Sequence, residues 1–360
     1  MIRRLVIVTW ALFSVAAQAA PPDDSYIAGY ATALLRQEIG LTGGTVEVRD
    51  GLVTVVADHV RGAQRDRMTT SLLTIPGVRQ VEIKETGELP SVAMTPSVRR
   101  EIPPPATHFF PLGQLFAPLH ADPRWPHFSA TYRRYIDAPE FTNVFAPTFG
   151  ESIALYRNSA PFEGQWELAV QGGVFAIFDI DTRSKDLINA DYLVALLSSY
   201  RSGDFSAFMR VAHTSSHLGD EYLLRSAVNQ VNRINLSLES VDVKLSYDLW
   251  DMFRIYGGGG YLVRTDPVTI KPGTAQFGLE FYSPRAYGSV RPVAYSDFQS
   301  FEESNWNMDV SARAGLQFEN VRIGDRYVQF LLEYFNGHSP NGQFFVQRIE
   351  SIGLGIHLYF

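Results

Sequence analysis

Residues 347–360 alternate between apolar side chains and side chains that are small or polar. The apolar positions are Ile352, Leu354, Ile356, Leu358 and Phe360, and the positions between them are Ser351, Gly353, Gly355, His357 and Tyr359. Because successive side chains of a strand point to opposite faces, this stretch predicts a strand with one apolar face. Such a face packs on a second sheet in a soluble sandwich, and it faces lipid in a membrane barrel.

The same alternation recurs from Pro126 onward and favours the barrel. It predicts about twelve strands, near residues 126–135, 147–156, 165–178, 188–201, 204–213, 231–247, 253–264, 274–283, 290–298, 306–319, 325–336 and 347–360. Most of these runs are long enough to cross a hydrocarbon layer when tilted. Closure of an even number of strands also removes exposed sheet edges. We therefore expect an all-β transmembrane barrel of about twelve antiparallel strands over residues 119–360.

The lengths of the connections predict the orientation of this barrel. The turns at Arg201–Asp204 and Asp248–Asp251 are short, whereas the connections at 214–230 and 337–346 are longer. Short periplasmic turns and long external loops are the asymmetry of outer-membrane barrels. The run Gly257–Gly260 predicts either a bend or a place where a bulky group packs inside the barrel.

The chain begins with a predicted signal peptide, residues 1–19. Met1–Arg4 is basic, Leu5–Ala16 is apolar, and Ala17-Gln18-Ala19 fits the small-residue cleavage pattern. Residues 23–86 then show the order helix, hairpin, helix, strand, which predicts a small α/β domain. The prolines of residues 87–118 predict a semi-rigid linker between this domain and the barrel.

Two segments of the small domain resemble the BON domain (bacterial OsmY and nodulation). These segments are Val46–Thr54 and Ile75–Val81. The resemblance implies contact with phospholipid or with another envelope surface. The alternative is a module that only holds the barrel near other parts of the envelope.

Composition excludes several functions. The net charge of -7 argues against a nucleic-acid partner, because binding phosphates requires a basic face. The chain has no Cys, which excludes disulfides, Cys-ligated zinc, a cysteine nucleophile and a lipoprotein anchor. After the N-terminus there is no apolar run of the length that a membrane-spanning helix needs.

The barrel region resembles an uncharacterised bacterial family, domain of unknown function 1207. The resemblance runs from about Phe116 to Phe360 and is carried by Ala121–Pro126, His213–Tyr222 and Gly337–Phe344. It implies an exported outer-membrane protein and does not imply an activity. The terminal Phe360 also resembles the signal by which bacterial outer-membrane barrels are recognised for insertion.

The densest polar cluster of the chain is His213–Glu221. The strand alternation places His213 and Ser215 side by side on the lipid face at the outer rim. An imidazole there can take the proton of the hydroxyl, and Asn232 on the next strand can orient the imidazole. This arrangement predicts Ser215 as nucleophile, His213 as base and Asn232 as the orienting residue.

An H-x-S pattern followed by an Asn on the next strand is similar to outer-membrane phospholipase A. That resemblance implies hydrolysis of phospholipid acyl esters with calcium. The Asn-Gly that follows the serine in that family is replaced here by Ser216-His217, and the spacing to Asn232 is longer.

Two other interpretations of the cluster stay open. Its side chains can form a hydrogen-bonded group that orders an external loop. Alternatively, Asp220 and Glu221 can supply oxygen ligands for calcium, or His213 and His217 can bind a transition metal.

The sequence thus predicts an outer-membrane barrel in contact with outer-membrane lipids, with its N-terminal domain in the periplasm and a structural or lipid-handling role. The first alternative is a serine-type lipid acyl hydrolase. The second is a small-solute porin, which ranks lower because inward side chains can block so narrow a barrel. No oligomeric state is indicated.

Overall fold

The structure of the chain is a computed structural model that describes residues 24–38, 45–49, 51–57, 62–85, 108–136, 141–226 and 234–360. It divides into two compact units, Met1–Ser91 and Val92–Phe360. The predicted signal peptide and residues 87–107 of the predicted linker lie outside the described residues. Among the described helices, none combines the length and the apolar character needed to cross a membrane.

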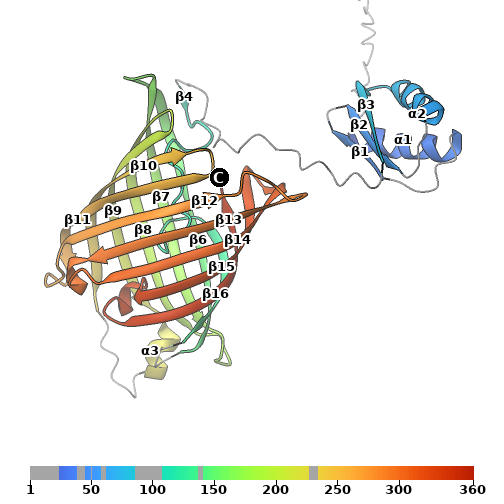
Figure 1. Cartoon of the computed structure of the whole chain (residues 1–360). Helices are drawn as coiled ribbons and strands as arrows, with labels where there is room; N and C mark the ends of the chain where they lie inside the picture. Colours follow the sequence, from blue (N-terminus) through green and yellow to red (C-terminus); the bar gives the residue numbers. More distant parts are fainter. Residues whose placement is uncertain are drawn as a thin grey trace, which may run out of the picture. The chain divides into compact units, whose positions relative to one another are not determined.

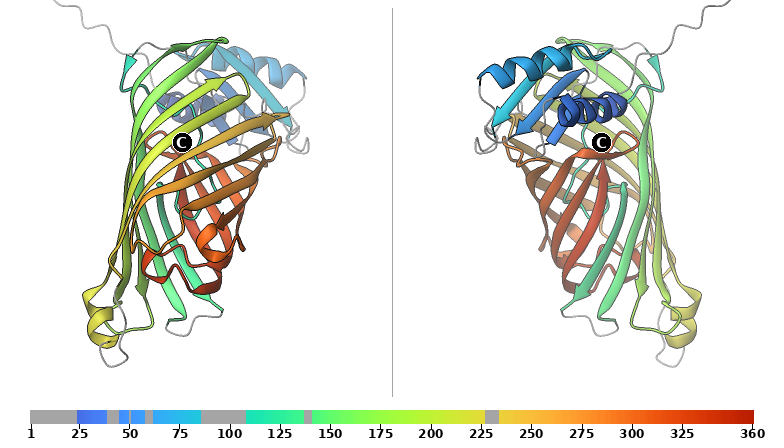
Figure 2. Two further views of the ribbon diagram at one scale, coloured as in Figure 1. Left: turned by 90° about the vertical axis from the view of Figure 1, so that its left-hand side faces the viewer. Right: turned by 90° about the vertical axis from the view of Figure 1, so that its right-hand side faces the viewer.

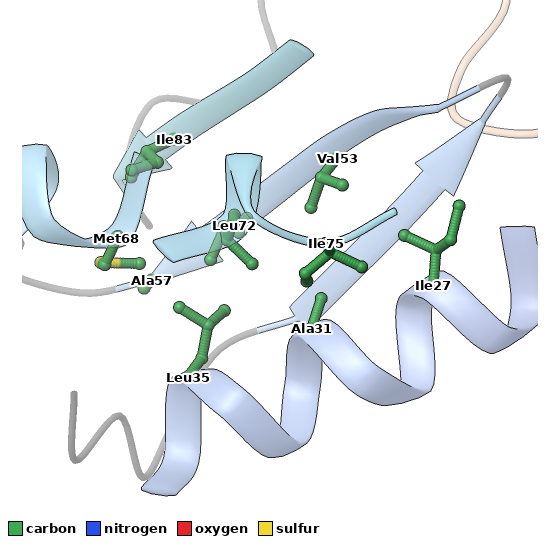
Figure 3. Close-up of a cluster of buried hydrophobic side chains, with 10 residues drawn as sticks. Ile27, Ala31, Leu35, Val53, Ala57, Met68, Leu72, Ile75 and Ile83 are labelled. Atoms are coloured by element: carbon green, nitrogen blue, oxygen red, sulfur yellow. The ribbon is translucent and has the colours of Figure 1, made fainter. Parts of the chain in front are cut away.

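The first unit is a small α/β domain, as predicted. Its elements are α1 (Asp24–Glu38), β1 (Thr45–Arg49), β2 (Leu52–Ala57), α2 (Gly62–Leu73) and β3 (Gln80–Glu85). β2 is the central strand, antiparallel to β1 and parallel to β3. Figure 3 shows side chains of α1 and α2 packed with those of the sheet, among them Ile27, Leu35, Met68, Val53 and Ile83. The helical spacing of apolar residues thus produces the core of this domain.

The second unit is a closed antiparallel barrel of twelve strands (Figure 1). The strands are β5 (Phe128–Tyr135), β6 (Asn143–Ala160), β7 (Gly164–Asp179), β8 (Leu187–Ser202), β9 (Phe205–Leu218), β10 (Leu236–Leu249), β11 (Phe253–Asp266), β12 (Gly273–Tyr282), β13 (Val290–Phe301), β14 (Met308–Ile323), β15 (Arg326–His338) and β16 (Arg348–Tyr359). Each strand pairs with the next, and β16 pairs with β5 to close the ring. All twelve predicted strands are confirmed.

The barrel is apolar outside and polar inside. In β16, Ile352 and Ile356 are each 50% exposed, whereas Ser351 and His357 are buried. The same division holds around the ring, with outward residues such as Phe149, Val170, Val194, Met209, Leu245, Ile255, Phe277 and Leu332 exposed, and inward residues such as Gln171, Asp242, Arg254, Glu280, Asp297, Arg313 and Gln329 buried. A soluble sandwich would bury its apolar faces instead. The exterior is therefore that of an outer-membrane barrel.

The two ends of the barrel differ as predicted. At the short-turn end, β8 and β9 are joined by residues 203–204, and β10 and β11 by residues 250–252. At the long-loop end, β9 and β10 are joined by residues 219–235, which include α3 (Asp220–Ser226). The connection 339–347 at the same end contains η3 (Gly342–Phe344). Figure 2 shows α3 at one end and the C-terminus towards the other.

We call the segment 110–127 the plug. It begins with the exposed residues Phe110 and Leu112, and from Leu115 onward it is largely buried inside the barrel. It follows β4 (His108–Phe109), which pairs with β6. The proline spacing had assigned its first part to the linker. Phe116, Leu119 and Trp125 of the plug are buried against Phe208 and Tyr256 of the wall.

The wall holds the plug through the plug backbone. Arg254 donates to the carbonyl oxygens of Ala117 (3.0 Å) and Pro118 (2.8 Å), and Arg313 donates to that of His120 (2.6 Å). An irregular buried segment cannot satisfy its backbone polar groups through secondary structure. In the plug, inward-facing wall residues supply these hydrogen bonds.

Candidate functional site

A cavity of about 490 Å³ lies inside the barrel between the plug and the long-loop end. This volume is in the range of small-molecule sites. Its lining includes the exposed residues Lys271, Asn305 and Val346, which belong to connections at the long-loop end. The cavity therefore opens at that end, whereas Asp122, Pro123 and Arg124 of the plug line its floor.

The floor carries charged side chains from the plug and from β9 and β10. Arg210 of β9 donates to both carboxylate oxygens of Asp242 of β10, at 2.9 and 3.2 Å. Lys244 Nζ lies 3.2 Å from Asp242 Oδ1. Arg124 of the plug pairs with the buried Asp191 of β8 at 2.6 Å.

A second polar group lies on the side of β12 and β13. Gln276 Nε2 donates to Asp122 and to Asp297, at 3.1 and 2.8 Å, and Gln299 Nε2 does the same at 3.1 and 2.8 Å. Tyr256 donates a further hydrogen bond to Asp297 (2.5 Å). Two amide groups thus separate two buried carboxylates that would otherwise repel each other.

Above the floor, much of the cavity wall is apolar. Along β9 and β10 the inward positions change from Arg210, Asp242 and Lys244 to Ala212, Leu236 and Leu238 towards the long-loop end. Leu193, Ile270 and Phe335 continue this apolar surface. The cavity therefore has charge at the bottom and an apolar surface above it, while polar residues such as Lys271, Glu303 and Asp309 line its mouth.

The glycine run of β11 shapes the floor. β11 pairs with β10 without interruption through these positions, so the run does not end the strand. A Cβ on Gly258 would lie 2.9 Å from Lys244 Cδ, and one on Gly260 would lie 2.9 Å from Asp242 Cβ. The inward glycines therefore leave space for the Lys244 and Asp242 side chains, in accord with the predicted packing of a bulky group.

On the outside of the barrel, His213 and Ser215 lie on the same face of β9. His213 pairs with Glu239 of β10, and its Nδ1 lies 3.9 Å from Glu239 Oε1. Glu239 also accepts a hydrogen bond from Arg264 of β11 (3.2 Å). Within the described part of the chain, no hydrogen bond joins His213 to Ser215, and Asn232 lies outside that part. The structure thus brings His213 and Ser215 to one face, and it also places the Glu239 carboxylate near His213.

The remaining polar residues of this stretch point in different directions, because β9 continues to Leu218. Ser216 faces inward and donates to Asn189 (3.1 Å), while the His217 ring packs on Tyr192 outside. Asp220 and Glu221 are exposed in the first turn of α3. In the described ranges, no group of three His, Cys, Asp or Glu side chains is placed to hold a metal ion. Asp220 and Glu221 alone offer fewer oxygen ligands than calcium takes.

Sequence reasoning missed Glu239 and the cavity floor. The signal for the floor is the charge at Arg210, Asp242 and Lys244, three positions that alternation places inside. The contact between Glu239 and His213 is harder to predict from the sequence, because it depends on the register between β9 and β10. The long connection between those strands leaves that register open.

Known proteins resemble the barrel in fold. Outer membrane phospholipase A from Escherichia coli has a TM-score of 0.47 at 12% identity, covering 66% of this chain and 93% of that one. The calcium-bound phospholipase dimer from Salmonella typhi has a TM-score of 0.46 at 10% identity, with coverages of 66% and 93%. The β domain of a Bordetella autotransporter, BrkA, has a TM-score of 0.34 at 14% identity, with coverages of 65% and 97%. No curated protein matches the sequence.

One family accounts for most of the sequence. Its match covers residues 38–360 and so includes much of the N-terminal domain, whereas the residue resemblance began near Phe116. The chain belongs to the family described as Protein of unknown function (DUF1207).

Proposed function

We propose that this protein is an outer-membrane barrel that handles lipid in the cell envelope by binding an amphiphile in its lumen. The observation that carries the proposal is the cavity, in which an apolar surface that includes Ala212, Leu236 and Leu238 lies above a charged floor. A ligand with a polar head and a hydrocarbon tail is complementary to this arrangement. The apolar exterior supports a position in the bilayer, where such ligands are abundant.

The plug argues against the small-solute porin. Its buried part occupies the lumen below the cavity, and wall arginines hold its backbone at Ala117, Pro118 and His120. A solute that enters from the long-loop end therefore meets the plug. A purely structural role would not require the cavity.

We further propose that the long-loop end faces outward and that the N-terminal domain lies in the periplasm. Short turns on the periplasmic side and long loops outside are the usual arrangement of such barrels. In this arrangement the first unit, which we propose to be BON-like, can contact phospholipid or another envelope surface.

Binding to purified protein tests the main proposal. A fluorescent single-chain fatty amphiphile is titrated into the full chain in lipid nanodiscs, and saturable binding is expected. Leu238→Arg places a charge in the apolar wall and is expected to weaken binding at least about tenfold. The matched control is Leu224→Arg, because Leu224 is 77% exposed on α3 and does not line the cavity. Equal binding by both variants would refute the lumenal site.

A second candidate function, lipid acyl hydrolysis, is favoured by the pair of His213 and Glu239. In this mechanism the Ser215 hydroxyl attacks the ester carbonyl and His213 takes its proton, which the imidazole later gives to the leaving alcohol. Water, deprotonated by the same imidazole, then attacks the acyl group on Ser215, and the proton returns to Ser215 as the fatty acid leaves. Glu239 orients the imidazole from Nδ1, the role that the sequence assigned to Asn232. The predicted use of calcium at Asp220 and Glu221 belongs to this candidate alone and would require further oxygen ligands.

Release of fatty acid from mixed micelles, with and without calcium, tests this second candidate. Ser215→Ala is expected to abolish release, and Glu239→Gln to reduce it. Ser237→Ala is the control, because Ser237 lies directly opposite Ser215 on β10. Asn232→Ala tells whether Asn232 or Glu239 orients the base. Unchanged release by Ser215→Ala would eliminate the assigned nucleophile.

A further inference from the structure

We infer that the floor of the cavity selects an amphiphile with an anionic head group, such as a fatty carboxylate, through Lys244 beside Arg210. This inference rests on the proposed lumenal binding and specifies the chemical class of the ligand.

The first argument is the balance of charge around Asp242. One carboxylate is shared by two cations, the Arg210 guanidinium at 2.9 Å and the Lys244 ammonium at 3.2 Å. These three groups together carry one positive charge. All three are largely shielded from solvent, since their side chains are 15% exposed or less. A surplus charge in such a place is unfavourable unless an opposite charge joins it.

The second argument is the unused hydrogen-bonding capacity of Lys244. An ammonium group has three donors, and the bond to Asp242 uses one of them. No further acceptor for Lys244 Nζ is present among the residues that the structure describes. The side chain is 4% exposed and lines the cavity. A carboxylate in the cavity would supply both the missing acceptor and the missing charge.

The other charges of the floor are already satisfied. Arg124 is paired with Asp191, which also accepts a hydrogen bond from the Gly342 backbone. Asp122 and Asp297 receive hydrogen bonds from Gln276 and Gln299 on all four carboxylate oxygens. These four donors belong to neutral amide groups, so a cationic head group facing Asp122 and Asp297 is the rival ligand.

The apolar wall sets the direction of the ligand. Lys244 and Asp242 lie at the floor, and Ala212, Leu236 and Leu238 follow towards the mouth. A head group at Lys244 therefore places its hydrocarbon tail along these side chains. Burial of each methylene contributes about 0.8 kcal/mol, which corresponds to roughly a fourfold gain in affinity per methylene.

The test compares three ligands with the same hydrocarbon chain, namely palmitate, hexadecanol and hexadecyltrimethylammonium, on the full chain in nanodiscs. Palmitate is expected to bind most tightly. Lys244→Met is expected to lower the affinity for palmitate at least about tenfold, which is the typical effect of losing one charge-assisted hydrogen bond. The affinity for hexadecanol should stay unchanged. Lys244→Arg keeps the charge and is expected to retain the preference. Lys185→Met is the control, because Lys185 is an exposed lysine that does not line the cavity.

The outcomes separate this inference from the proposed function. If none of the three ligands binds, the proposed lumenal function fails. If all bind but palmitate has no advantage, or keeps its advantage in Lys244→Met, the function stands and the anionic selection is refuted. Tightest binding of hexadecyltrimethylammonium would also refute it, and would assign the head group to Asp122 and Asp297.

Discussion

Glu280 connects the plug to the wall with both of its carboxylate oxygens. Oε1 accepts a hydrogen bond from the His120 backbone (2.9 Å) and lies 3.0 Å from the His120 ring, while Oε2 pairs with Arg254 at 3.2 Å. Arg254 in turn donates to Ala117 and Pro118. A single fully buried carboxylate thus holds several residues of the plug in place.

Glu280→Gln is therefore expected to destabilise the folded barrel. The amide keeps the shape of the side chain but leaves the Arg254 charge buried without its carboxylate, at a cost of about 3–5 kcal/mol. The measurement is the midpoint of thermal unfolding in detergent micelles, which should fall. Glu163→Gln, at an exposed turn, is the control and should leave the midpoint unchanged. Equal midpoints for the two variants would contradict the role assigned to Glu280.

The two faces of the glycine run should respond differently to alanine. A Cβ on Gly258 would lie 1.9 Å from the Val243 carbonyl oxygen, so β10 or β11 would have to move. A Cβ on Gly257 would make contacts of 3.5 Å, which are ordinary. Gly258→Ala is expected to lower the unfolding free energy by about 1–3 kcal/mol, and Gly257→Ala to have little effect. Electrophoresis after graded heating measures both, and the reverse order of stability would refute this assignment of faces.

At the residue scale, alternation predicted the faces of the candidate residues but not their partners. It correctly placed His213 and Ser215 outside. It could not identify Glu239 as the neighbour of His213, because that contact depends on the register across a connection of residues 219–235. Asn232 stays a prediction, as does the catalytic role of all these residues.

At the element scale, the strands were predictable because each has one face towards lipid and one towards the lumen. Their ends were less so. β6 begins at Asn143 instead of near residue 147, and β9 extends to Leu218 instead of ending near residue 213. Polar residues continue the hydrogen-bonded ladder in β9 after the apolar alternation has stopped, so periodicity underestimates its length.

The plug gave no sequence signal of its structure, although Ala121–Pro126 contributed to the family resemblance. It has no periodicity, and its hydrogen-bond partners lie far along the chain, such as Arg254 and Arg313. A proline-rich segment with these properties is indistinguishable from a linker until the wall that satisfies its backbone is known.

Emptying the lumen should convert the barrel into a channel. In the full chain, residues 111–124 are replaced by a Gly–Ser sequence of equal length, while the ring of paired strands that closes the barrel is retained. Discrete conductance steps are expected in a planar bilayer, whereas the unaltered protein should be silent. Insertion of both proteins is verified by their heat-dependent mobility on gels. Steady conductance by the unaltered protein would contradict a closed plug.

At the scale of the whole molecule, the two units use apolar residues in opposite ways. The first unit buries Ile27, Leu35 and Met68 in a core, as a domain in water must. The second unit exposes residues such as Val194 and Leu332, each 65% exposed, on its outer surface. The overall hydrophobic content of 46% therefore does not reveal this difference between the units. The difference lies in whether the apolar side chains are buried in a core or exposed on the outer surface.

This contrast, together with the loop asymmetry, predicts the orientation in the cell. β4 pairs with Tyr156 and Arg157 near the short-turn end of β6, and β16 ends at Tyr359 at the same end, so the chain that precedes the barrel strands comes from that side. With epitope tags placed singly in α3, in the turn 250–252 and in the N-terminal domain, only the α3 tag should be labelled on intact cells. The other two should be labelled after the outer membrane is permeabilised. Labelling of the N-terminal tag on intact cells would reverse the orientation, and the cavity would then open towards the periplasm.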